Sequence, residues 1–204
     1  MSELIDFDYS AAVAEMVMEE KKGTMKKIQQ KIYDETSFTK KCILVKKFIP
    51  SQSTFMESVI RTDLEIDKPV DTTSGDGCKD GLNYEIKHSG HAKNGQFNFV
   101  QIRPDHNVDY YIFTVYNMYY KSSVIGKGYI FKVPADIVYE WILIYGGYAH
   151  GSIEQLGRIT KDNIKGRNCE YVFRGNSNAK PGTKNYRFWQ ELLEYEVEYA
   201  AKSF

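Results

Sequence analysis

The spacing of apolar residues changes near Asp67, from a helical repeat before it to short alternating runs after it. Two earlier segments, Tyr9–Tyr33 and Ser51–Leu64, place apolar residues three or four positions apart, which predicts two helices. Asp67–Gly81 is then rich in Pro, Asp, Thr and Gly, which favour turns. Helices followed by strands indicate an α/β or α+β fold.

Four runs after this turn-rich segment have the composition and alternation of β-strands. They are Leu82–His88, Phe97–Arg103, Tyr110–Tyr116 and Gly128–Val133.

Two later segments predict helices. The first has Pro134 as its first residue and ends near Gly146–Gly147, and the second is amphipathic and spans Tyr186–Ala201. Between them, Ile153–Phe173 is interpreted as irregular with room for short strands, and Gly175–Lys184 as a loop.

The length of 204 residues, 42% of them hydrophobic, suits one domain with a substantial core. We expect a single α/β (α+β) domain over residues 1–204, with a central mixed β-sheet flanked by helices. Its parts are a helical N-terminal part at 1–66, a sheet that carries the chemistry at 67–133, and a helix and loop-rich tail at 134–204.

The chain has 27 basic and 27 acidic residues, so its net charge of zero neither favours nor excludes a nucleic-acid partner. No apolar run approaches the roughly 18 residues of a membrane span, and Met1–Tyr9 lacks the apolar stretch of a signal peptide. The three cysteines, Cys42, Cys78 and Cys169, form no CxxC pair, which argues against a zinc ribbon. We therefore expect a cytoplasmic protein with no membrane partner.

The segment Gly75–His88 carries the clearest chemical pattern, an acid in a glycine-rich turn followed by an acid and an amine on a strand. Side chains of a strand point alternately to its two faces, so Glu85 and Lys87 share one face and Ile86 lies on the other. Three glycines near Asp76 suit a tight hairpin that returns this acid beside Glu85. The pattern predicts two carboxylates and one ammonium group close together.

Two carboxylates beside a lysine suit a Mg²⁺ site, because Mg²⁺ takes one or two carboxylates and keeps several waters. Asp76 and Glu85 would supply the carboxylates, and water and a phosphate the remaining ligands. Bound Mg²⁺ polarises a phosphoryl oxygen and acidifies a water, while Lys87 would orient that water and offset developing charge. The pattern therefore predicts hydrolysis of phosphodiester bonds.

An aspartate followed by Glu-x-Lys resembles the PD-(D/E)xK nuclease superfamily, and the wider string resembles its type II restriction endonucleases. By this resemblance Asp76 stands at the first acid, Glu85 at the second and Lys87 at the lysine, while Gly75 replaces the proline of the motif. The resemblance implies a restriction-endonuclease-like fold and Mg²⁺-dependent, site-specific cleavage of double-stranded DNA to 5′-phosphate ends. It also implies a homodimer on a palindromic site.

In this superfamily a polar residue of the next strand and a glutamate of an upstream helix often join the site. Alternation would place Gln101 on the same face as Phe97 and Arg103, where it could position water or phosphate. Glu57, in the second predicted helix, is the preferred third metal ligand, and Glu20 is its rival. The plainer interpretation of Gln101 and Glu57 is ordinary solvated polar residues.

Basic and amide side chains that grip phosphates or read bases are the candidates for binding DNA. Between Arg158 and Arg187 basic residues predominate, and only Asp162 and Glu170 oppose them. The candidates are His91, Lys93 and Arg103 near the predicted site, and Arg174, Asn178, Lys180 and Lys184 in the tail.

Two alternatives remain open. One keeps the fold but makes the protein a structure-selective or repair nuclease that nicks rather than cuts at a sequence. The other is a non-catalytic DNA-binding subunit, against which the complete set of Asp76, Glu85 and Lys87 argues.

Overall fold

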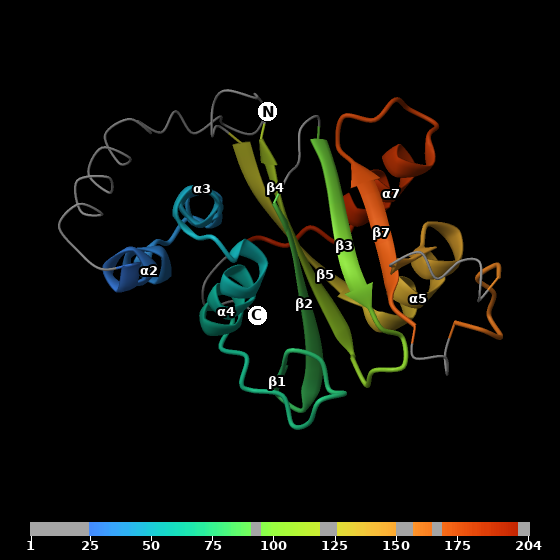
Figure 1. Cartoon of the computed structure of the whole chain (residues 1–204), viewed down its shortest axis with the longest axis horizontal. Coiled ribbons are helices and arrows are strands. Elements are labelled where there is room, and N and C mark those ends of the chain that lie inside the picture. Colours follow the sequence, from blue (N-terminus) through green and yellow to red (C-terminus); the bar gives the residue numbers. More distant parts are fainter. Residues whose placement is uncertain (1–24, 91–94, 119–125, 150–156, 165–168, 200–204) are drawn as a thin grey trace.

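The helices of this chain form an N-terminal and a C-terminal group on opposite sides of the strands (Figure 1). The computed structural model describes residues 25–90, 95–118, 126–149, 157–164 and 169–199. Its helices are α2 (Met25–Asp34), α3 (Phe38–Phe48), α4 (Gln52–Asp63), α5 (Ala135–Ile144) and α7 (Lys184–Leu193). Its strands are β1 (Gly77–Lys79), β2 (Leu82–Gly90), β3 (Gln96–Ile102), β4 (Tyr110–Met118), β5 (Gly126–Pro134), β6 (Gly147–Tyr148) and β7 (Tyr171–Asn176). None of these helices is long and apolar enough to cross a membrane.

The strands form two sheets. The first has the order β1-β2-β4-β5, with β2 antiparallel to β1 and parallel to β4, and β5 antiparallel to β4. The second is antiparallel, with the order β3-β7-β6. The expected α/β domain with a mixed sheet is therefore confirmed. Because β2 and β4 are parallel, the chain between them must cross over, and β3 makes this crossing as part of the second sheet.

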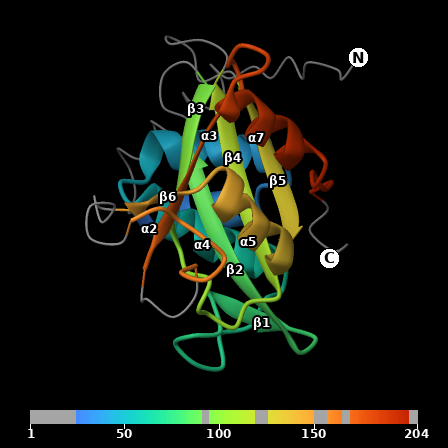
Figure 2. The ribbon, with the colours of Figure 1, turned by 90° about the vertical axis from the view of Figure 1, so that its right-hand side faces the viewer.

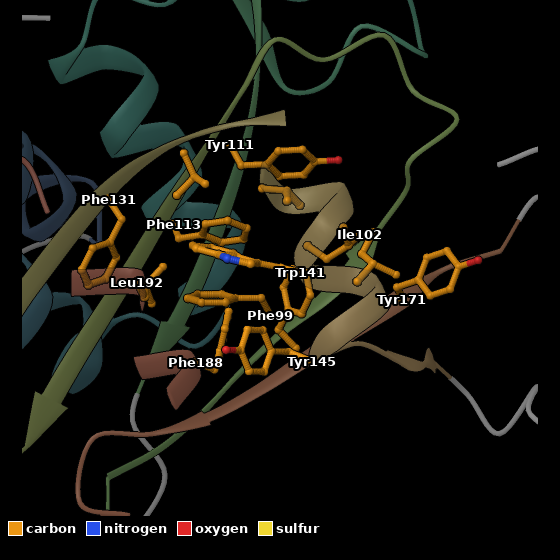
Figure 3. Close-up of a cluster of buried hydrophobic side chains, with 14 of the residues drawn as sticks. Phe99, Ile102, Tyr111, Phe113, Phe131, Trp141, Tyr145, Tyr171, Phe188 and Leu192 are labelled. Carbon is orange, nitrogen blue, oxygen red and sulfur yellow. The ribbon is translucent and has the colours of Figure 1, made fainter. Parts of the chain in front are cut away.

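Alternation along β2 and β4 gives the first sheet two apolar faces. On one face Tyr84, Ile86 and Ile112 pack with α2, α3 and α4. On the other face Tyr111 and Phe113 join β3, β7, α5 and α7 in an aromatic core (Figure 3). Figure 2 shows α5 and α7 in front of this face and α3 and α4 behind the sheet. With both faces covered, the edge of the sheet is the part left open for a site.

The helices α2 and α3 differ from the sequence expectation. Of the helix predicted for Tyr9–Tyr33, only the part from Met25 lies within the described residues. No element was expected at Phe38–Phe48, where four lysines give the segment the look of solvated surface. It forms α3 because its apolar residues are buried and the side chain of Ser37 caps its first turn, accepting from Lys40 N (3.4 Å).

The tail also differs from the expectation. Pro134 lies at the N-cap of α5, one residue before the helix. Strand β7 begins in the segment where the sequence leaves room for short strands, but it continues into residues 175–176, where the sequence predicts a loop. The helix predicted for Tyr186–Ala201 is wrong for residues 194–199, because α7 ends at Leu193, and the last two residues of that prediction lie outside the described residues.

Residues 194–199, the C-terminal strap, run from α7 back along β5. The N–H of Val197 donates to Ile130 O (3.0 Å), and Val197 and Tyr199 pack with the α2–α4 core rather than with α7. If the helix continued past Leu193, these side chains would stay next to α7. Their packing in the α2–α4 core therefore determines where α7 ends.

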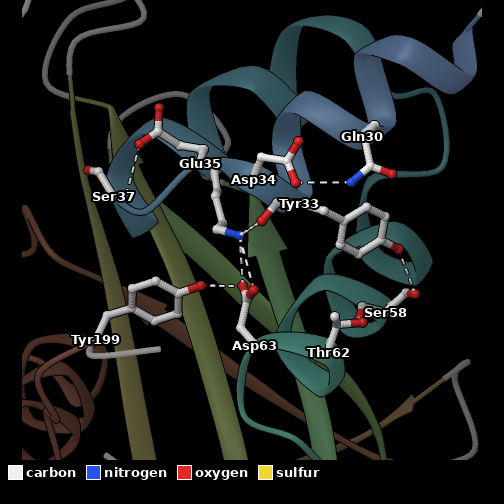
Figure 4. A network of polar contacts seen from close by, with 10 residues as sticks. Gln30, Tyr33, Asp34, Glu35, Ser37, Ser58, Thr62, Asp63 and Tyr199 are labelled. Carbon is white, nitrogen blue, oxygen red and sulfur yellow. Dashed lines mark hydrogen bonds and ion pairs between the residues drawn. The ribbon is translucent and has the colours of Figure 1, made fainter. Parts of the chain in front are cut away.

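The strap meets a buried ion pair between α3 and α4. The Lys41 side chain is only 1% exposed, and its ammonium nitrogen lies 3.0 Å from the Asp63 carboxylate and 2.9 Å from Tyr33 O. The Tyr199 hydroxyl donates to the same carboxylate (Figure 4). Since removing one member of such a network leaves a charge buried alone, these contacts fix α3, α4 and the strap together.

The His88 imidazole on β2 makes the stability of the fold depend on pH. Its Nδ1 lies 2.9 Å from Thr114 Oγ1 of β4. Burial lowers the pKa of His88 from 6.5 to about 4, and the charge of Lys46 adds to the effect. The neutral ring is thus favoured in the folded state, and its stabilisation is complete above pH 6.5 and is lost as the pH falls toward 4.

We expect the wild-type protein to lose about 2 kcal/mol more unfolding free energy than His88→Gln between pH 7 and pH 4.5. Urea unfolding at a series of pH values measures the difference. Equal losses in the two proteins would contradict this role for His88.

Candidate active site

The hairpin of β1 and β2 brings Asp76 to Glu85. Its register pairs Gly77 with Tyr84 and Lys79 with Leu82. The two residues of the turn, Asp80 and Gly81, both have positive φ, 53° and 79°, as a type I′ turn requires. Asp-Gly is a preferred sequence for that turn, so local turn chemistry fixes the register of the hairpin.

Gly75 allows the chain before β1 to lie directly against β2. Its φ is +72°, and a Cβ at this position would come within 2.5 Å of Tyr84 O. The N–H of the next residue, Asp76, donates to the same Tyr84 oxygen (2.7 Å). A side chain at Gly75 would therefore push the following acid away from β2.

The Asp76 carboxylate takes the place of a strand partner for β2. Strand β1 pairs with β2 only as far as Tyr84, and beyond it Asp76 Oδ2 accepts a hydrogen bond from Ile86 N (2.7 Å). This bond holds the carboxylate at the edge of β2 beside Glu85. Only Oδ2 is used by the hydrogen bonds found within the described residues, which leaves Oδ1 available to a ligand.

Glu85 and Lys87 point to the same side of β2 and form an ion pair. Glu85 is only 5% exposed, and the Lys87 side chain is 14% exposed. Burial raises the pKa of Glu85, the charge of Lys87 opposes the rise and the charge of Asp76 adds to it. The pair is thus partly desolvated and lies next to a second acid.

Glu57 of α4 adds a third carboxylate. Burial and, to a smaller extent, the charge of Asp76 raise the pKa of Glu57 to about 7, and the charge of Lys87 opposes this rise. Glu85 acts in the same direction as Asp76. Mutual repulsion of this kind requires the carboxylates to be near each other. We call Glu57, Asp76, Glu85 and Lys87 the acidic edge.

The acidic edge has the donor chemistry of a divalent-cation site. The carboxylates of Asp76 and Glu85 lie beside the Lys87 ammonium group, and burial, with the charge of neighbouring acids added to it, raises the pKa values of Glu57 and Glu85. Across the described ranges, no three His, Cys, Asp or Glu side chains are already gathered as a ready metal-binding group. A Mg²⁺ ion needs only one or two carboxylates beside its waters, and Asp76 with Glu85 meets that requirement.

The expected orientation of Gln101 is wrong. The pairing of β3 with β7 shifts register between Phe99 and Ile102, and Gln101 adopts a φ of 57° in this bulge. The extra residue moves Ile102 into the core position that follows Phe99 and leaves Gln101 exposed. Gln101 therefore does not continue the face of Phe97.

The predicted DNA-binding residues are placed differently from one another. Arg103 is held by Glu170, with Nε 3.0 Å from Oε1. Four others are exposed, on β7, on the loop after it and at the start of α7: Arg174, Asn178, Lys180 and Lys184. His91, Lys93 and the rival metal ligand Glu20 lie outside the described residues.

The charge of His106 also acts on Glu85, although the sequence suggests only an ordinary surface or core histidine. Its charge lowers the pKa of Glu85, and its Nδ1 is buried without a hydrogen-bond partner in the described part of the chain. The parallel register of β2 and β4 sets Glu85 beside Tyr111, so the loop that leads into β4 ends near Glu85. Sequence spacing does not reveal this pairing.

We expect Gly75→Ala to lower the free energy of unfolding by about 3 kcal/mol, the sum of left-handed strain and the contact with Tyr84 O. Gly81→Ala is the matched control, because Gly81 has a similar φ of +79° but nothing within 4 Å of its added Cβ. We expect Gly81→Ala to lower the free energy of unfolding by only about 1 kcal/mol. Urea unfolding measures both, and equal losses would show that the chain does not press against β2 at Gly75.

No protein-family model, no curated protein and no solved structure matches this chain.

Proposed function

We propose that this protein is a Mg²⁺-dependent deoxyribonuclease that hydrolyses phosphodiester bonds of double-stranded DNA with a restriction-endonuclease-like active site. The observation that carries the proposal is the convergence of Asp76, Glu85 and Lys87 at the open edge of β2. These are the residues that match the PD-(D/E)xK pattern in the sequence.

Asp76 and Glu85 would hold the metal, and Glu57 would approach it from α4. Bound Mg²⁺ supplies polarisation of a phosphoryl oxygen and acidification of a water. Burial, with the charge of Asp76 added to it, raises the pKa values of Glu57 and Glu85, and a bound cation would favour their charged forms.

Lys87 would orient the attacking water and offset the charge that develops on the phosphate. It is mostly buried beside Glu85, which fixes its ammonium group and strengthens its electrostatic effect. When a phosphate binds, it would compete with Glu85 for this ammonium group and release the carboxylate for the metal.

Site-specific cleavage by a homodimer is also part of the proposal. It rests on the resemblance to type II restriction endonucleases. A structure-selective or nicking nuclease would use the same residues, and the products distinguish the two.

Digestion of a supercoiled plasmid of mixed sequence with Mg²⁺ tests the function. We expect discrete fragments from the wild-type protein, none in EDTA, and losses of at least about 100-fold in Asp76→Asn, Glu85→Gln and Lys87→Ala. Glu140→Gln is the control, because this carboxylate is exposed on α5. Nicked circles alone would favour the structure-selective enzyme, and no cleavage by folded protein would refute the nuclease.

Metal binding is measured separately, without DNA. At Mg²⁺ concentrations near ten times the Kd, we expect the melting temperature of the wild-type protein to rise by about 3–6 °C. Asp76→Asn should abolish this shift, whereas Lys87→Ala should keep it, because Lys87 binds no metal. A shift that persists in Asp76→Asn would place the ion elsewhere.

A further inference from the structure

A second polar surface lies beside the acidic edge, on the outward side of β3 and β7. Along β3, Phe97 and Phe99 point into the aromatic core, so the residues between them point outward. The antiparallel register sets Gln96 opposite Asn176 and Asn98 opposite Arg174. We call this surface the ribbon face: Gln96, Asn98, Val100, Arg174 and Asn176.

Three polar side chains of the ribbon face are available to a ligand, whereas Asn176 Oδ1 accepts a hydrogen bond from Asn178 N (2.8 Å). Within the described residues, the side chains of Gln96, Asn98 and Arg174 have no hydrogen bond or ion pair to other side chains or to the backbone. The Arg174 guanidinium lies across the ribbon toward β6, where a Cβ on Gly147 would be 3.6 Å from its Nη1. Val100 is 48% exposed, which is unusual for a large apolar residue on a strand.

These side chains are the ones that read base pairs. Asparagine and glutamine make paired hydrogen bonds with adenine, arginine with guanine, and apolar side chains contact the thymine methyl group. No acidic residue belongs to the ribbon face, so nothing on it repels phosphate. A two-stranded antiparallel ribbon also has the size to enter the major groove of B-form DNA, which is about 12 Å wide.

The ribbon face is joined directly to the acidic edge. The N–H of Asn98 donates to Ser89 Oγ of β2 (3.0 Å). Ser89 follows Lys87 by two residues, which is about 7 Å along a strand. A ribbon centred in the major groove has a phosphate backbone about 6 Å to either side, half of the groove width. In Figure 1, β2 accordingly lies between α4 and β3, with β7 beyond β3.

We propose that the ribbon face reads base pairs of duplex DNA in the major groove, with Asn98 and Arg174 as its main base contacts. This inference rests on the nuclease function proposed above and names where its specificity resides. Duplex RNA does not suit the surface, because its major groove is too narrow and deep for a ribbon. Exposed Lys180 and Lys184, beyond the end of β7, would hold the flanking phosphates.

The test selects sequences from a randomised duplex DNA library with the cleavage-deficient Asp76→Asn protein. We expect the parent to enrich a fixed sequence, and Asn98→Ala and Arg174→Ala each to lose the preference at a different position. Affinity for the enriched duplex should fall about tenfold in each variant. Lys27→Ala, an exposed lysine on α2, is the control and should leave both properties unchanged.

Three results would overturn the inference: unchanged sequences from both variants, no enrichment by the parent, or equal binding of duplex RNA. Cleavage by the wild-type protein is measured independently with Mg²⁺. If the wild-type protein cleaves DNA but Asn98→Ala and Arg174→Ala keep the sequence preference of the parent, only the proposed role of the ribbon face is refuted. If the protein selects a sequence that depends on these residues but the wild type does not cleave, only the nuclease function is refuted.

Discussion

The hydrogen bond from Ile86 N to Asp76 Oδ2 holds the acidic edge together. A backbone N–H that is shielded from water needs a partner, and β1 ends its pairing with β2 before reaching Ile86. The Asp76 carboxylate accepts the hydrogen bond that β1 does not make. The point where β1 stops pairing with β2 therefore determines where the Asp76 carboxylate lies. Gly75 and the Asp80–Gly81 turn also support this hydrogen bond. The turn sets the register of β1 on β2, and Gly75 allows the segment before β1 to lie close to β2.

The acidic edge is held in a state that electrostatics alone disfavours. Glu57 and Glu85 are buried enough to raise their pKa values, and each is raised further by neighbouring acids. Lys87 is the ammonium group within the edge, and it pairs with Glu85. Buried carboxylates that lie near other acids cost folding energy. The fold tolerates the cost because two apolar cores stabilise the sheet on either side.

Local features of the sequence predicted the hairpin, the alternation of β2 and, in outline, helices before the strands and helices after them. Turn residues and alternation act over a few positions, so they can be recognised without knowing the fold. The orientation of Gln101 was not predictable, because a bulge inserts one residue and reverses the alternation. The pairing of β3 with β7 and the approach of His106 to Glu85 join segments far apart in the chain, which spacing does not encode. For α3, four lysines hid an apolar stripe that only packing reveals.

The C-terminal strap has a consequence for how the molecule unfolds. Two cores on opposite faces of a sheet can melt separately when little connects them besides the sheet. Here residues that follow a helix of one core pack in the other, through Val197 and Tyr199, and end on the ion pair of Asp63. Fraying of this segment would loosen both cores at once. The strap thus makes the domain a single cooperative unit, in which the acidic edge keeps its shape until the whole fold gives way.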